Sequence, residues 1–104
     1  MSAEFYIIFE NIDWYYSNKD KIKQKIMSLN TFIYHTNDEF WLKEDKQFND
    51  LYFDIRLFLD DEYILLEITM HPANIEKDLK EFCNWLRLNT IIKIQDEDFN
   101  ISNW

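Results

Sequence analysis

The chain has 104 residues, a formal net charge of −9 and an aromatic content of 18%, and it contains no glycine. This length and hydrophobic content fit a single folded domain, residues 1–104, and argue against a disordered segment. The acidic charge argues against direct binding to nucleic acid or to an anionic membrane, because both need a basic surface. Without glycine, every glycine-rich nucleotide-binding loop is excluded.

The sequence also bears on where the protein works. It contains no apolar run long enough for a transmembrane helix, and its acidic start is unlike a signal peptide. The single cysteine, Cys83, lies on the apolar face of a predicted helix, so we interpret it as a buried thiol and not as a nucleophile. We therefore expect a cytoplasmic protein that does not contact a membrane.

The first half of the chain begins with a strand. Residues 4–10 carry apolar side chains on both faces, which is typical of a strand inside a sheet. Residues 11–16 are predicted to form an aromatic loop that contains Trp14 and Tyr15. These two side chains either pack against the core or anchor a partner, because Trp and Tyr dominate binding hot spots. Residues 17–30 have the apolar spacing of a helix.

The middle of the chain is predicted to be rich in strands. Residues 31–36 form one strand, and residues 39–43 either extend it or form a short strand of their own. Residues 51–59 and 63–70 alternate apolar and polar side chains, which predicts a hairpin with a charged turn between them. Only Phe58 breaks the alternation of the first of these strands.

Pro72 stops the hairpin and opens a helix that ends near Asn89, and residues 90–95 form the last predicted strand. The order is β-α-β-β-(β)-α-β. We expect an α+β fold of ferredoxin-like character, with a mostly antiparallel sheet and two helices on one face.

This predicted topology would bring several loops that are both acidic and aromatic to one end of the sheet, and it would place the turn at residues 60–62 at the other end. Such a surface suits fast, steered binding of a basic protein around aromatic anchors. The residues expected to contact the partner are Asp13, Trp14, Tyr15, Asp38, Glu39, Trp41, Glu44, Asp45, Asp96, Glu97 and Asp98.

Residues that could carry chemistry are sparse. His35 and His71 are far apart in the chain, and no His or Cys pair has the spacing of a metal site. Carboxylate pairs are abundant, but acid–base catalysis needs a pocket that separates their pKa values. We expect no catalytic residue, no metal, no cofactor and no enzyme activity.

In size, acidity, aromatic content and single α+β domain, the chain resembles small acidic bacterial toxin-immunity proteins of the contact-dependent inhibition type. The most family-like stretch is DLKEFCNWLRLNTIIKIQDED, residues 78–98. The resemblance implies a protein that binds and neutralises a cognate toxin domain, often a basic nuclease.

Three alternatives stay open at this stage. The acidic surface also suits a phage-type inhibitor or DNA mimic, although that role needs carboxylates spaced evenly over a long face. A small-molecule-binding domain would need a pocket between sheet and helices. A homodimer is possible if the outer side of the predicted hairpin, with Tyr52, Asp54, Arg56 and Phe58, pairs two sheets.

Overall fold

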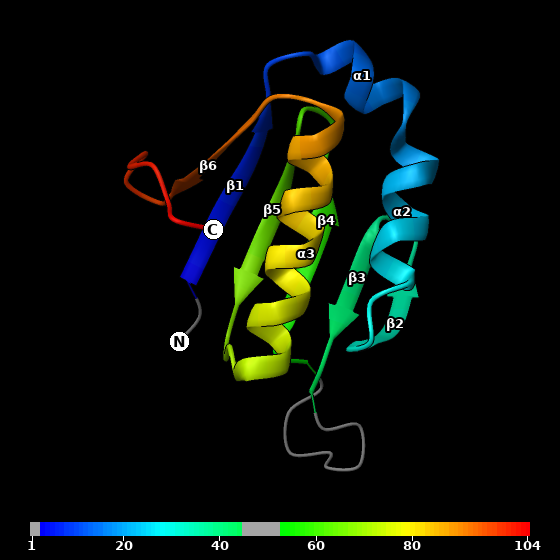
Figure 1. The fold of residues 1–104 in the computed structure, drawn as a ribbon, viewed down its shortest axis with the longest axis vertical. Helices are drawn as coiled ribbons and strands as arrows, with labels where there is room; N and C mark the ends of the chain where they lie inside the picture. Colours follow the sequence, from blue (N-terminus) through cyan, green and yellow to red (C-terminus); the bar gives the residue numbers. More distant parts are fainter. Residues whose placement is uncertain (1–2, 45–52) are drawn as a thin grey trace.

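A sheet of six strands forms the centre of the structure, a computed structural model that describes residues 3–44 and 53–104 (Figure 1). The elements in chain order are β1 (Ala3–Phe9), α1 (Ile12–Ser17), α2 (Lys19–Met27), β2 (Phe32–Thr36), β3 (Glu39–Leu42), β4 (Ile55–Leu59), β5 (Tyr63–Ile68), α3 (Ala73–Asn89) and β6 (Ile92–Asp96). The strands follow the order β2-β3-β4-β5-β1-β6, and all neighbours are antiparallel. The predicted α+β class is confirmed.

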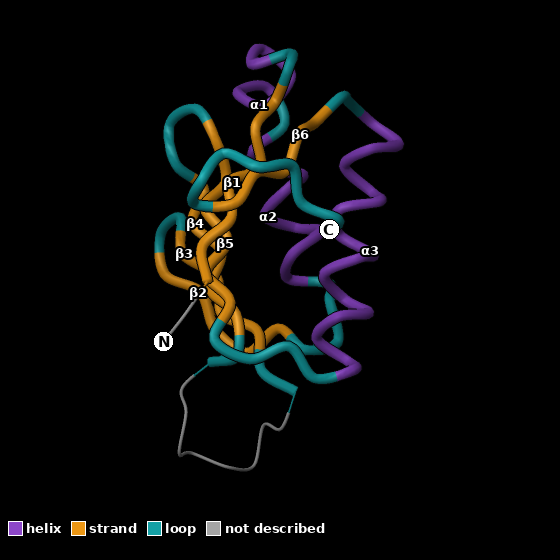
Figure 2. Tube along the Cα trace, turned by 90° about the vertical axis from the view of Figure 1, so that its left-hand side faces the viewer, coloured by secondary structure: helices purple, strands orange, loops and turns teal. Residues whose placement is uncertain are grey.

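The helices α2 and α3 lie on one side of the sheet, and no described helix covers the other side (Figure 2). The alternation read from the sequence decides which strand residues face the helices. Ile55, Leu57, Ile64 and Leu66 are fully buried between sheet and helices, as predicted. The α3 face that carries Leu79 and its apolar neighbours at helical spacing packs against them.

The strand order extends the predicted arrangement. β5 and β6 run in the same direction on either side of β1 and are joined by α3, which is a split β-α-β unit. Residues 39–42 form a strand of their own, so β2 and β3 add a hairpin beyond β4. Because of this hairpin, the exact ferredoxin-like order is not reproduced.

Residues 12–17 form a helix where a loop was expected, because Asn11 caps it. The Asn11 side chain accepts a hydrogen bond from the backbone N–H of Trp14 (3.2 Å), and Asp13 lies in the first turn, where an acid suits the helix dipole. Asn18 then separates α1 from α2. Residues 3–44 and 53–104 therefore contain three helices, where two were expected.

The chain beyond β6 protects one edge of the sheet. Ser102 donates its backbone N–H to the Ile94 carbonyl (2.7 Å), and Ile101 bridges Gln95. Covering an edge strand in this way blocks pairing with other chains. No helix in the described part of the chain has the length and apolar character needed to span a membrane.

Candidate functional site

The uncovered side of the sheet carries large apolar side chains in register across several strands. Phe58 of β4 lies beside Leu65 of β5, and Leu65 lies beside Tyr6 of β1. The next row contains Trp41 of β3 and Arg56 of β4. All five are only partly buried, because these positions alternate with the residues that face the helices. We call this side of the sheet the open face.

Arg56 contacts two aromatic rings and two carboxylates on the open face. Its guanidinium lies 4.4 Å from the ring centre of Phe53 and 5.2 Å from that of Phe58. Its Nε and Nη2 donate hydrogen bonds of 3.1 and 2.7 Å to Glu67 Oε1, and its Nη1 lies 3.7 Å from Glu39 Oε2. Two carboxylates surround one guanidinium, so this part of the open face keeps a negative charge.

A second feature is a group of acids at one end of the sheet. The turn between β2 and β3 and the turn between β4 and β5 are neighbours, since Leu59 N–H donates to the Asp38 carbonyl (2.8 Å). Burial and then the charges of Asp60, Asp38 and Asp61 raise the pKa of Tyr15 above its ordinary range. We call these three aspartates the acidic end.

The acidic end corrects the expected distribution of charge. The turn at residues 60–62 was expected at the end of the sheet away from Asp38, and the structure places it beside Asp38. The cause is the separate strand β3, which reverses the direction of the chain once more before β4. Tyr63 joins the acidic end to the open face, and burial followed by the Asp60 carboxylate raises its pKa.

The residues predicted to contact a partner fall into separate regions. Asp38 belongs to the acidic end, and Glu39 follows it at the start of β3. Asp13 lies in α1 with Tyr15, which bonds Asp60, whereas Glu44 lies at the opposite end of β3. Asp45 is outside the described residues. The structure therefore does not gather the predicted residues at one end of the sheet.

Asp96 ends β6 at the edge of the sheet opposite β2, and Glu97 and Asp98 follow it. Glu97 Oε1 accepts a hydrogen bond from the backbone N–H of Glu4 at the start of β1 (2.9 Å). Asp96 Oδ1 accepts from the backbone N–H groups of Asp98 and Asn100 (2.9 and 3.0 Å). Asp96 thus shapes a turn, whereas Glu97 and Asp98 lie at its surface.

The predicted aromatic contacts also have different environments. Tyr15 is fully buried, and its hydroxyl donates to the Asp60 carbonyl (2.6 Å), so it belongs to the core and not to the surface. Trp14 is half-buried and packs against Phe9 and Trp85. Trp41 lies on the open face.

Sequence reasoning missed Tyr6 and Ile8 as surface residues. Their signal was present, because the first strand is apolar on both faces. That pattern was interpreted as a strand inside a sheet, and β1 does lie between β5 and β6. The same pattern also marks apolar side chains on a face that no described helix covers (Figure 2). Phe58, which breaks the alternation of its strand, carries the same signal.

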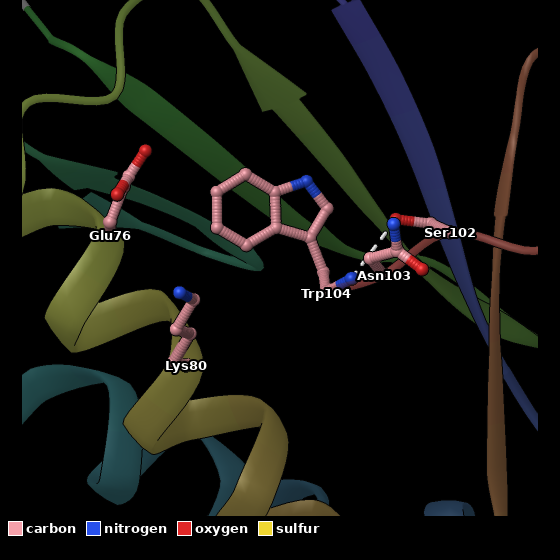
Figure 3. A pocket seen from close by; sticks show the side chains of 5 residues that line it. All are labelled: Glu76, Lys80, Ser102, Asn103 and Trp104. Atoms are coloured by element: carbon pink, nitrogen blue, oxygen red, sulfur yellow. Dashed lines mark hydrogen bonds between the residues drawn. The ribbon is translucent and has the colours of Figure 1, made fainter.

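A hollow beside α3 and the reactive side chains of the described residues do not indicate a class of ligand or a reaction. Glu76, Lys80 and Trp104 line a hollow between α3 and the last residues of the chain, and its opposite charges favour no class of ligand (Figure 3). The described residues contain no group of three or more metal-ligating side chains. Burial raises the pKa of the Cys83 thiol to about 11, so this thiol carries its proton at neutral pH.

Comparison with protein families, with curated proteins and with solved structures gives no match for this chain.

Proposed function

We propose that this protein binds a basic protein through its open face and acts in the bacterial cytoplasm as an immunity protein that neutralises a toxin domain. The observation that carries the proposal is the open face itself. Phe58, Leu65 and Tyr6 form a row of partly exposed apolar side chains across three strands, and Trp41 lies in the next row beside Arg56. Carboxylates lie next to them, on a side of the sheet that no described helix covers (Figure 2).

The two kinds of residue serve different steps of binding. Large apolar side chains at the centre of an interface supply most of the affinity when a partner removes them from water. Acids around them attract a basic partner and accelerate its association. A nuclease-type toxin fits this surface, because an enzyme that binds a phosphate backbone carries a basic surface of its own.

The test first captures the partner protein and then measures whether the chain neutralises it. The full chain is immobilised and exposed to lysate of its native host, and the retained protein is identified and then co-expressed with the chain in a bacterial test strain. We expect a basic protein in equimolar amount that arrests growth when expressed alone. Co-expression of the chain should restore growth.

Two matched variants locate the interface. Leu65→Lys places a charge at the centre of the open face, and Leu88→Lys makes the same change at an exposed position of α3. We expect the first variant to lose capture and neutralisation and the second to keep both, with circular dichroism showing that both are folded. Equal behaviour of the two variants would remove the open face from the proposal.

Further outcomes would overturn the proposal as a whole. A retained protein that does not harm growth contradicts toxin neutralisation, and so does the absence of any retained basic protein. A broad set of nucleic-acid-binding proteins released by salt would indicate a DNA mimic. A dimer of the chain in sedimentation, lost in Leu65→Lys, would show that the open face binds a second copy.

A further inference from the structure

A hollow of about 350 Å³ lies on the open face beside the covered edge of the sheet. Its lining comes from β1, β5, β6 and the turn after β6, and consists of Tyr6, Ile8, Tyr63, Gln95, Glu97 and Phe99. Three aromatic rings and one carboxylate thus face the same small volume. This combination is typical of a site that holds a cation, because ring faces and carboxylates both attract positive charge.

The rings are held in place by the fold. Tyr6 and Tyr63 meet edge to face with ring centres 5.4 Å apart. Phe99 lies within the turn that Asp96 organises, has a φ angle of 66° and leaves 76% of its surface exposed. This ring therefore makes little contact with the core and remains available to a ligand.

The carboxylate of the hollow is also fixed. Glu97 Oε1 accepts the N–H of Glu4, which anchors the side chain at the start of β1 (2.9 Å). A carboxylate accepts about four hydrogen bonds, so Glu97 keeps capacity for a ligand. The basic side chain nearest in register is Lys93, which pairs with Ile8 on the side of the hollow away from Glu97.

The same open face already shows how it holds an arginine. Arg56 lies over Phe53 and Phe58 and donates two hydrogen bonds to Glu67. The hollow offers the same partners, aromatic rings and a glutamate, without an arginine of its own among the lining residues. A planar guanidinium stacks on rings and bonds a carboxylate better than an ammonium does.

We propose that this hollow receives an arginine side chain of the basic partner, with the guanidinium against Tyr6, Tyr63 and Phe99 and hydrogen-bonded to Glu97. The inference rests on the proposed function for the source of the arginine. Beyond the proposed function, the inference names the side chain of the partner that is bound, an arginine, and the place on the open face where it binds.

The test uses N-acetyl-arginine amide as the probe and the full chain in solution, followed by NMR. We expect saturable shifts of the Phe99, Tyr6 and Gln95 signals at millimolar probe. N-acetyl-citrulline amide has nearly the same shape without the charge, and it should bind roughly tenfold more weakly.

Two variants that each remove one negative charge distinguish binding of the probe in the hollow from general electrostatic attraction to the acidic chain. Glu97→Gln loses the carboxylate of the hollow, and Asp98→Asn loses that of the next residue, which does not line it. We expect roughly tenfold weaker probe binding in the first and unchanged binding in the second. Phe99→Ala should also weaken binding.

Shifts that grow linearly with concentration, or equal effects of Glu97→Gln and Asp98→Asn, would overturn the arginine site. A lack of any shift would do the same. The two proposals fail separately. If the chain captures a toxin in a way that depends on Leu65 but does not bind the probe, the proposed function is supported and the arginine site is contradicted. If the chain binds the probe but captures no toxin, the arginine site is supported and the proposed function is contradicted.

Discussion

Single buried polar side chains connect the loops of this protein to its core. Asp78 of α3 is only 3% exposed and accepts hydrogen bonds from the Thr31 backbone N–H (2.8 Å) and hydroxyl (2.7 Å). Tyr15 similarly ties α1 to the turn between β4 and β5. Buried donors need such partners, because an unsatisfied donor costs free energy when it loses water.

Replacing Asp78 with Ala tests this role. Both Thr31 donors would remain buried without their acceptor, so we expect the free energy of unfolding in urea to fall by about 2–3 kcal/mol. Glu81→Ala, on the same helix, removes an exposed ion pair with Lys25 and should cost about 0.5 kcal/mol or less. Equal losses in the two variants would contradict the role of Asp78.

Cys83 gives a prediction about pH. Burial raises its pKa from 9.0 to about 11, so the folded chain keeps a proton that the unfolded chain loses. The stabilisation is therefore complete below about pH 9 and is lost as the pH rises from about 9 to about 11, with a total on the order of 2 kcal/mol. Between pH 8 and 11, the wild type should lose more unfolding free energy than Cys83→Ala. Parallel pH profiles would contradict this.

At the scale of the elements, the turns form without glycine. Asn37 closes the β2–β3 hairpin with a φ angle of 50°, in the left-handed region that asparagine tolerates better than most residues. This turn carries Asp38 to the acidic end, so its geometry decides where part of the charge lies.

Changing Asn37 should alter the stability of the hairpin in opposite directions. Asn37→Gly relieves the backbone strain and should raise the free energy of unfolding by about 0.5 kcal/mol. Asn37→Val places a branched side chain at the same φ angle and should lower it by about 1–2 kcal/mol. The control is Asn103→Gly, at a position where the structure shows no positive φ, and it should bring no gain. Urea denaturation measures all three variants.

At the scale of the whole molecule, the net charge of −9 opposes the folded state, because folding brings like charges together. Salt screens this repulsion, so raising sodium chloride from low concentration to about 0.5 M should raise the thermal midpoint. Asp61→Asn relieves part of the repulsion at the acidic end and should show a higher midpoint and a smaller response to salt. A midpoint that falls with salt would show that attractive ion pairs dominate.

The charge has a second consequence for the whole molecule. The open face exposes aromatic and aliphatic side chains, and such a surface tends to associate with copies of itself. Two chains of charge −9 repel each other, which favours a partner of opposite charge over a second copy.

Local patterns in the sequence were enough to determine the α+β class and most of the elements. Alternation identified the buried residues Leu57 and Leu66, and helical spacing with Pro72 and Asn89 set the bounds of α3. These features depend on neighbours in the chain, so the order of residues encodes them directly. The helix at residues 12–17 was missed because its run of aromatic residues was interpreted as a loop, and Asn11 was not identified as a helix cap.

Only the tertiary structure decided which faces and loops meet. Residues 39–42 could extend a strand or form a new one, and this choice reversed the chain and brought Asp38 beside Asp60. Whether a helix covers the second face of β1 is equally invisible in its own sequence, yet it decides whether Tyr6 is core or surface. Both depend on contacts between residues far apart in the chain, which local periodicity does not record.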